Sequence, residues 1–173
     1  MPIEAYLVRH GQSRQNVGLT DHPDSELTDL GTEQSRAVAL QLVACDLRGF
    51  AGIVSPYRRA RQTAEVIAAA TGLTFEIDER VREWGQSVTI DGRAYELEPI
   101  DEVVLRLRDF IESRRGERLV VVSHGTPIAL LTQLIRGEPT TTVGNFWDGV
   151  ENCCLRRVSP SAAAAPSADR ASP

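Results

Sequence analysis

The sequence predicts an α/β protein with three layers, in which helices cover both faces of a mainly parallel central sheet. Short apolar runs alternate with segments whose apolar residues recur at helical spacing, which is the pattern of helices packed on such a sheet. The run "RLVVVS" (Arg118–Ser123) is continuously apolar rather than alternating, as expected of a parallel strand buried on both faces. These two patterns together determine the expected fold class.

Five strands are expected along the chain. In chain order they are Ile3–Val8, Gly52–Val54, Leu73–Ile77, Arg118–Ser123 and Asn152–Val158. Two longer stretches, Gly11–Ser25 and Asp78–Pro99, show no clear period and are expected to be loops.

Four helices are expected between these strands. They run from near Thr28 to Val43, from Tyr57 to Gly72, from near Ile100 to near Gly116, and from Pro127 to Ile135. Thr28 is suited to cap the first helix, and Gly72 marks the end of the second. Pro127 suits the first turn of the last helix, and Gly137 follows its end.

Composition narrows the classes of protein and of partner. The chain of 173 residues is long enough for one domain, which we expect to cover residues 1–158. Residues 159–173, rich in Ala, Pro and Ser, have little to bury and are expected to be a disordered tail. A net charge of −5 argues against nucleic-acid binding. No run reaches the ~18 apolar residues of a membrane span.

The start of the chain and its cysteines bear on the compartment. "MPIEAYLVRH" lacks the basic region and long apolar stretch of a signal peptide, so a cytoplasmic protein without membrane partners is expected. Cys45 and the adjacent pair Cys153–Cys154 form neither a CxxC pair nor a spaced Cys/His set. We therefore expect reduced core thiols, with no metal site and no disulfide.

Two strands end in the same way. "YLVRHG" and "VVVSHG" are each an apolar strand followed by a His-Gly pair, so His10 and His124 are expected at one edge of a parallel sheet. "IVSPYRRAR" adds arginines where a third strand meets a helix, whose N-terminal amides favour anions. Each feature alone has an ordinary structural explanation, such as a hydrogen-bonded histidine or a solvated arginine face. Their coincidence in one chain favours a phosphate pocket.

These segments also carry a family resemblance. "LVRHGQSRQN" resembles the RHG signature of the histidine phosphatase superfamily, which contains cofactor-dependent phosphoglycerate mutases and many small phosphatases. The likeness continues in family order through "LTDLGTEQS", "SPYRRARQTAE", "VREW" and "VVSHG", and covers residues 3–158. It implies a phosphoglycerate mutase-like fold and a phosphoryl-transfer site without cofactor or metal.

The resemblance implies roles for three residues at the first and third strand ends. His10 matches the nucleophile that becomes phosphohistidine, and Arg9 and Arg59 match the two arginines that hold the phosphoryl group. Arg59 is preferred over Arg58 because it directly precedes "ARQTA". General histidine chemistry agrees with a nucleophilic His10. A neutral imidazole attacks through one ring nitrogen when its other nitrogen is held as a hydrogen-bond donor.

Four further residues are assigned by the same resemblance. His124 matches the second pocket histidine and Gly125, which follows it, is expected to bind substrate. Asn16 matches a phosphate-contacting asparagine. Glu83 aligns with the acidic residue that protonates the leaving group, although Glu79 and Asp78 lie nearby in the sequence. Two arginines and His124 supply the fixed charge that phosphoryl transfer requires.

The leading hypothesis is a metal-independent phosphomonoesterase, a phosphoric monoester hydrolase, acting on a small phosphorylated metabolite or a phosphoprotein. One alternative is a phosphoglycerate mutase, and another is a weakly catalytic regulator that binds a phospho-ligand. Mutases of this superfamily carry long segments after the acidic residue and at the C-terminus, whereas only Trp84–Pro99 separates Glu83 from the next helix here. Trp84 and Trp147 are expected to pack rather than to line the pocket mouth. The sequence indicates neither the physiological substrate nor the oligomeric state.

Overall fold

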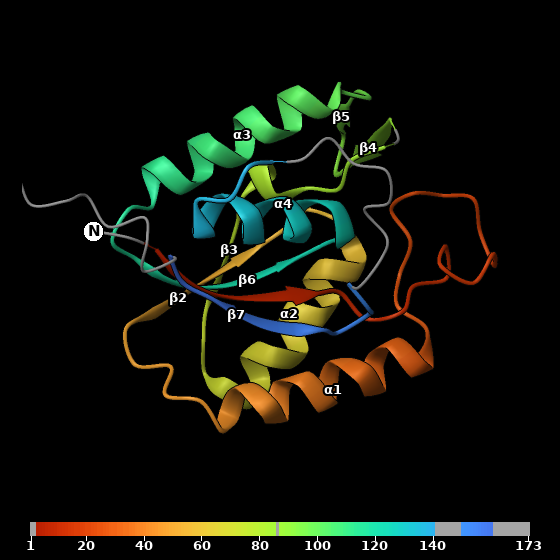
Figure 1. The fold of residues 1–173 in the computed structure, drawn as a ribbon. Coiled ribbons are helices and arrows are strands. Elements are labelled where there is room, and N and C mark those ends of the chain that lie inside the picture. Colours follow the sequence, from red (N-terminus) through yellow and green to blue (C-terminus); the bar gives the residue numbers. More distant parts are fainter. Residues whose placement is uncertain (1–2, 86, 141–149, 161–173) are drawn as a thin grey trace, which may run out of the picture.

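The computed structural model describes residues 3–85, 87–140 and 150–160. Its central sheet has five strands in the order β3-β2-β6-β1-β7 (Figure 1). These strands are β1 (Glu4–Arg9), β2 (Phe50–Val54), β3 (Phe75–Ile77), β6 (Arg118–Ser123) and β7 (Leu155–Val158). Neighbouring strands are parallel except for β7, which pairs antiparallel with β1 at one edge. The mainly parallel sheet expected from the sequence is confirmed.

Two pairs of helices cover the sheet, one pair on each face. Figure 1 shows α1 (Asp29–Val43) and α2 (Arg58–Thr71) on one face, and α3 (Ile100–Ser113) and α4 (Gly125–Arg136) on the other. The strands serve both faces by alternation, because successive side chains point in opposite directions. In β1, Leu7 packs into the core beneath α3 and α4, whereas Val8 packs into the core beneath α1 and α2. The three-layer fold class is therefore confirmed.

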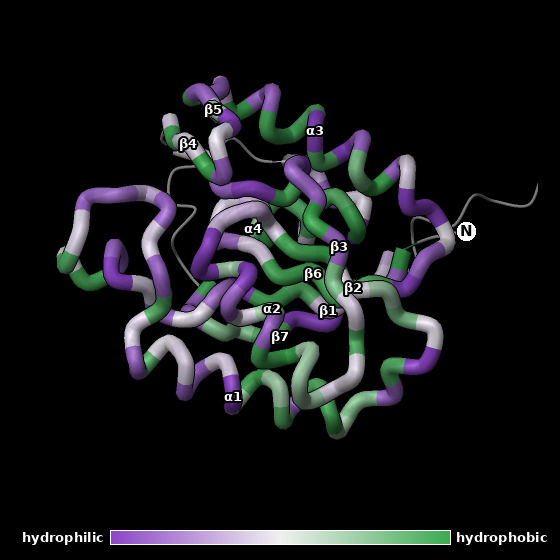
Figure 2. The backbone as a smooth tube through the Cα atoms, turned by 180° about the vertical axis from the view of Figure 1, so that it is seen from behind, coloured by the Kyte–Doolittle hydropathy of each residue, from purple (hydrophilic) through white to green (hydrophobic). Residues whose placement is uncertain are grey.

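Hydrophobic residues follow the same plan. Figure 2 shows the hydrophobic strands at the centre of the molecule, with hydrophilic segments along the outer helices and loops. In β6, Leu119, Val120, Val121 and Val122 are all fully buried, because both faces of this strand are covered. This burial is what the continuously apolar run in the sequence predicted.

The helix ends also agree with the sequence signals. The Thr28 side chain accepts a hydrogen bond of 3.0 Å from the Gly31 amide and caps α1. Gly72 and Gly137 close α2 and α4 with φ of 76° and 71°, in the left-handed region that glycine adopts readily. These caps fix where the helices begin and end relative to the strand ends that carry the histidines.

The expected loop 78–99 was wrong in part. It contains a short 3₁₀ turn, Glu79–Val81, and a hairpin of two three-residue strands, β4 (Val88–Ile90) and β5 (Arg93–Tyr95). The hairpin turns at Asp91-Gly92, both at positive φ, which is a favoured sequence for a two-residue hairpin turn. Strands of three residues are too short to show an alternation of apolar and polar residues. The Asp91-Gly92 turn was therefore the main sign of a hairpin in the local sequence.

The last strand begins later than expected, at Leu155 rather than Asn152. The Cys153 amide donates to the Arg9 carbonyl over 3.0 Å, and Cys153 has a φ of 54°, so this segment turns instead of continuing the ladder. The three cysteines are free thiols, but they are half-buried rather than fully buried in the core.

Parts of two expectations fall outside the described residues. Residues 161–173 of the expected tail and Trp147 are not among them. Within the residues that are described, no helix is long and apolar enough to cross a membrane.

Candidate active site

The site lies where three neighbouring strands end. β2, β6 and β1 are adjacent and parallel, so their carboxyl ends share one edge of the sheet. His10 follows the last residue of β1, His124 follows the last residue of β6, and Arg59 lies in the first turn of the helix after β2. The topology thus brings together groups that are far apart in the chain, as expected for a parallel α/β sheet.

The loop that carries His10 is fixed by side chains from both helices of one layer. The Gly11 amide donates to Thr63 Oγ1 on α2 over 3.1 Å, and the Gln12 amide donates to Gln34 Oε1 on α1 over 2.8 Å. Gly11 also lies so close to α1 that an added Cβ would be 2.3 Å from the Gly31 carbonyl oxygen. Its φ is not positive, so close approach rather than turn geometry requires glycine here.

His10 is buried and held in one tautomer. Its Nδ1 lies 2.6 Å from the Gly11 carbonyl oxygen, which can only accept, so Nδ1 carries the hydrogen. Its Nε2 accepts a hydrogen bond of 2.9 Å from Nε of Arg59 and therefore holds the lone pair. Burial, then the Arg59 charge, then the Arg9 charge lower the pKa of His10 well below its usual range. The imidazole is accordingly neutral and aimed through Nε2.

His124 is fully buried beside His10. The two ring centroids lie 5.0 Å apart, and the Ser55 hydroxyl oxygen lies 2.7 Å from Nε2 of His124. Its Nδ1 has no hydrogen-bond partner in the described structure and lies 3.8 Å from a carboxyl oxygen of Glu83. Such an unsatisfied buried atom is costly unless a ligand completes it. This nitrogen is therefore suited to meet a phosphoryl oxygen or a leaving group.

Arg59 enters the site from α2, whereas its neighbour Arg58 does not. Arg59 is only 4% exposed, its NH1 donates to the Pro23 carbonyl, and its guanidinium lies 4.7 Å from the Tyr57 ring centroid. Arg58 is on the surface, where its amide donates to Asp24. Adjacent helical residues point about 100° apart, so only one of the pair can face the site.

Arg9 approaches from the other side of His10. Its NH1 donates to the Val150 carbonyl, and its Nε is buried with no hydrogen-bond partner in the described structure. Burial lowers the pKa of Arg9 from its usual value, although an arginine remains charged. Two cations thus flank the nucleophile.

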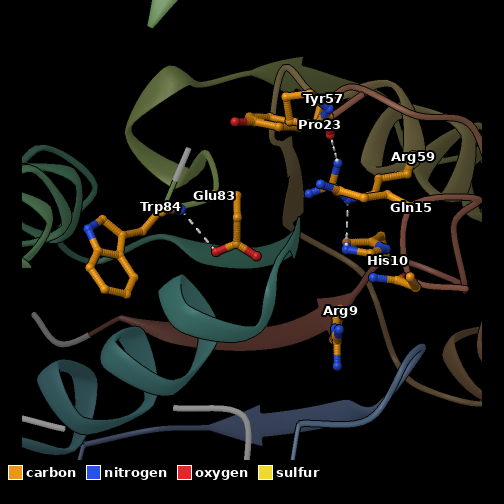
Figure 3. Close-up of a pocket in the computed structure, with 10 residues that line it drawn as sticks. Arg9, His10, Gln15, Pro23, Tyr57, Arg59, Glu83 and Trp84 are labelled. Atoms are coloured by element: carbon orange, nitrogen blue, oxygen red, sulfur yellow. Dashed lines mark hydrogen bonds between the residues drawn. The ribbon is translucent and has the colours of Figure 1, made fainter. Parts of the chain in front are cut away.

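Glu83 faces these cations across the site (Figure 3). One of its carboxyl oxygens accepts a hydrogen bond of 3.0 Å from the Trp84 amide. Burial raises the pKa of Glu83 above its usual value, while the Trp84 amide and the charges of Arg59 and Arg9 oppose the rise. A carboxyl group in this state can carry a proton at a pH where an exposed glutamate has lost it.

These groups border a cavity of about 280 Å³. Ten of the residues that the structure describes line it: Arg9, His10, Gln15, Asn16, Pro23, Tyr57, Arg59, Glu83, Trp84 and Gly85. Asn16 uses its side-chain oxygen to accept from the Ser13 amide over 3.0 Å, which leaves its NH₂ group as a donor. His124 lies behind the lining, and Gly125, the first residue of α4, is buried without lining the cavity.

Comparison with known proteins identifies the family. Residues 5–96 match the model of the histidine phosphatase superfamily (branch 1). The chain belongs to this superfamily. It is 31% identical over 185 positions to a probable phosphoglycerate mutase GpmB of Photorhabdus laumondii, with 90% of this chain and 84% of the relative covered.

Solved structures of the superfamily share the fold. One described as mycobacterial hydrolase 1 has a TM-score of 0.64 at 26% identity, covering 89% of this chain and 87% of the other. A mycobacterial glucosyl-3-phosphoglycerate phosphatase has a TM-score of 0.67 at 24% identity, covering 89% and 88%. The fold class of this chain is therefore that of these two structures.

Several residues near the histidine phosphatase site were not singled out from the sequence. Gln15 and Tyr57 line the cavity from the recognised segments "LVRHGQSRQN" and "SPYRRARQTAE", whereas nothing in the local sequence marks Pro23 and Gly85, which also line it. Trp84 was expected to pack. It does pack against the core beneath α3 and α4, and it also lines the cavity.

Other missed residues act behind the cavity and did carry a signal. Gln34 belongs to "LTDLGTEQS", and Ser55 and Thr63 belong to "SPYRRARQTAE". Both segments were recognised, but no role was given to these side chains. The structure shows that they hold the His10 loop and the His124 ring.

The described residues contain no cluster of three or more His, Cys, Asp or Glu that could hold a metal ion. Metal independence itself stays a prediction for experiment.

Proposed function

We propose that this histidine phosphatase superfamily member hydrolyses small phosphomonoesters through a phosphohistidine on His10. The observation that carries the proposal is the state of His10, whose Nδ1–H is bound to the Gly11 carbonyl while Nε2 presents its lone pair beside Arg59. A nucleophilic histidine needs this arrangement. The cavity volume of about 280 Å³ is close to the lower end of the usual range for ligand pockets, which begins near 300 Å³. A volume of this size suits a small metabolite.

In the first step, Nε2 of His10 attacks phosphorus, and the bond from phosphorus to the ester oxygen breaks. Arg59 leaves Nε2 and, with Arg9, binds the phosphoryl oxygens. The Gly11 carbonyl stabilises the positive ring that forms, because it accepts from Nδ1–H. Charge spreads over three equatorial oxygens in the transition state, so fixed cations supply most of the acceleration.

The departing alkoxide takes its proton from the Glu83 carboxyl group. Burial raises the pKa of Glu83, which favours the protonated carboxyl group that this step requires. In the second step, Glu83 as carboxylate takes a proton from water, whose oxygen attacks phosphorus and releases His10. Phosphate leaves, and the resting state returns with both groups as they began.

A phosphoglycerate mutase is the second candidate. Curated relatives about 30% identical over 90% of this chain carry the name probable phosphoglycerate mutase. A mutase uses the same cradle but returns the phosphoryl group to the substrate instead of water. The two activities therefore differ in the acceptor that attacks the phosphohistidine, which is water in a phosphatase and a substrate hydroxyl in a mutase.

The test of the proposal is to trap the intermediate. The protein is mixed with ³²P-labelled phosphomonoesters and phosphopeptides in the presence of EDTA, and the reaction is quenched in alkali within milliseconds, because phosphohistidine is acid-labile. We expect a labelled protein that loses its label in acid and free phosphate that accumulates with turnover. His10→Ala should show neither. Binding of substrate without label or phosphate would favour the regulator, and a strict need for added magnesium would contradict the mechanism.

A further inference from the structure

The peptide segment that carries Glu83 is held from α3 by one arginine. Arg106 NH1 donates to the Arg80 carbonyl, and Arg106 NH2 donates to the Arg82 carbonyl over 3.1 Å. The same guanidinium is paired with Glu98, whose carboxyl oxygen lies 2.7 Å from NH2 and 2.8 Å from Nε. A single planar cation thus contacts the backbone on the N-terminal side of Glu83.

Glu98 contacts the segment on both sides of Glu83. The indole Nε1 of Trp84 donates to the Glu98 carbonyl over 2.8 Å, and Arg82 NH2 donates to the second carboxyl oxygen of Glu98 over 2.8 Å. Trp84 and Glu98 lie at the two ends of the segment that contains the β4–β5 hairpin. Both sequence neighbours of Glu83 are therefore tied to the Glu98–Arg106 pair.

This pair is buried. The side chains of Arg106 and Glu98 are 10% and 11% exposed, and that of Arg82 is 18% exposed. Burying an ion pair is a poor way to gain stability, because desolvation offsets much of the attraction. Its fixed geometry is more useful, since an arginine fork bound to two carbonyls and a carboxylate allows little movement. A proton donor needs such support, because a catalytic group must be held within about 0.5 Å of its working position.

We propose that Arg106 and Glu98 are positioning residues for Glu83, holding its backbone so that its carboxyl group meets the leaving oxygen. The proposal rests on the proposed function, in which Glu83 is the acid. Neither residue lines the cavity, so they act through residues 80–84 rather than on the substrate.

The test compares two leaving groups. Arg106→Gln and Glu98→Gln should lower kcat/KM, which reports the steps up to cleavage of the ester bond, by about 10- to 100-fold for an alkyl phosphate such as glycerol 3-phosphate. This loss is smaller than the roughly 10²- to 10⁴-fold contribution of a general acid, because the acid is displaced rather than removed. For p-nitrophenyl phosphate, kcat/KM of both variants should stay close to the wild-type value, because p-nitrophenolate leaves without a proton and the later attack of water does not enter kcat/KM. Arg106→Lys should not rescue the alkyl rate, since an ammonium lacks the fork that spans both carbonyls.

Arg114→Gln is the matched control. Arg114 caps the end of the same helix and is 18% exposed, and its ion pairs among the described residues are with Glu76, Asp78 and Glu117 rather than with residues 80–84. It should lower both rates equally or not at all. Circular dichroism and thermal melting establish which variants are folded. If Arg106→Gln does not fold, the nearly isosteric Glu98→Gln gives the same comparison, and if neither folds the pair is structural and the proposal is wrong.

Glu83→Gln separates failure of this proposal from failure of the proposed function. If Glu83→Gln slows the alkyl phosphate selectively while folded Arg106 and Glu98 variants slow both substrates alike, or neither, the positioning role is wrong and the acid role stands. If Glu83→Gln itself shows no selectivity, the acid assignment is wrong and the positioning role falls with it.

Discussion

The Nε atom of Arg59 donates a hydrogen bond of 2.9 Å to Nε2 of His10. The atom assigned to attack phosphorus is therefore covered by a cation that also belongs to the phosphate cradle. In the proposed mechanism, an incoming phosphate dianion competes for the same guanidinium, so binding of substrate would uncover the nucleophile. One arginine thus couples binding of the phosphoryl group to exposure of Nε2.

This relationship predicts unequal effects for two neighbouring arginines. Arg59→Ala should lower kcat by about 10²- to 10³-fold, the usual loss when one transition-state donor is removed. Arg58→Ala should change kcat by less than about threefold, because its ion pair with Glu26 is at the surface. Steady-state kinetics with p-nitrophenyl phosphate measure both. A reversal of the two effects would show that the other arginine faces the phosphate.

The pKa of Glu83 predicts a pH dependence that differs between substrates. Burial raises this pKa, while the Trp84 amide and the charges of Arg59, Arg9 and Arg106 oppose the rise. The ratio of kcat/KM for an alkyl phosphate to kcat/KM for p-nitrophenyl phosphate should fall as pH rises through that pKa, because only the alkoxide needs the proton. Effects on binding that are common to both substrates cancel in the ratio. Glu83→Gln should give a ratio that is low at every pH, and a pH-independent wild-type ratio would remove Glu83 from the acid role.

Much of this site was predictable because it lies at the ends of regular elements. A buried strand is recognisable from its apolar run, and the residue after it must lie at the sheet edge. His10 and His124 could therefore be placed together without coordinates. Thr28 and Gly72 marked helix ends through local hydrogen bonding and backbone conformation, which depend on few residues.

The remaining parts depend on long-range packing that no short window contains. Pro23 reaches the site only because its loop folds back until its carbonyl meets Arg59. The β4–β5 hairpin is stabilised by Val88 and Ile90 packing with Tyr57, a contact between distant segments. Arg106 looked like an ordinary polar residue of an amphipathic helix. Its hydrogen bonds to the carbonyls of residues 80 and 82 depend on tertiary packing that the helix sequence does not contain.

The close approach of Gly11 and Gly31 predicts that the spacing between the His10 loop and α1 controls the position of the His10 side chain. An added Cβ at Gly31 would lie 2.0 Å from the Gln12 carbonyl oxygen, which belongs to the loop that carries His10. Gly31→Ala should therefore destabilise the protein by about 1–3 kcal/mol, as overpacking does, and lower kcat by displacing that loop. Urea unfolding and steady-state kinetics measure the two effects. Glu33→Ala, an exposed change in the same helix, should stay within about 0.5 kcal/mol. Normal stability and activity in Gly31→Ala would mean that the loop and α1 separate easily.

The hairpin after Glu83 bears on whether the phosphoryl group is passed to water or back to a substrate. A mutase must keep water from the phosphohistidine while its intermediate reorients, which requires a cover that closes over the site. Here the residues that follow Glu83 are tied at their base by the bond from Trp84 to the Glu98 carbonyl. Val88 and Ile90 of the hairpin pack with Tyr57, which lines the cavity, whereas the hairpin strands themselves are not among the described lining residues.

We expect a short segment held in this way not to close over the site, so water should reach the intermediate and hydrolysis should be favoured. We predict that 3-phosphoglycerate, where it is accepted, yields glycerate and free phosphate faster than 2-phosphoglycerate. The measurement is phosphorus NMR of the protein incubated with 3-phosphoglycerate and a trace of 2,3-bisphosphoglycerate, with p-nitrophenyl phosphate turnover as proof of an active preparation. His10→Ala should abolish both products, because both routes pass through the same phosphohistidine. Interconversion of the two phosphoglycerates that outpaces phosphate release would establish the mutase instead, and would mean that water is excluded by some element other than this hairpin.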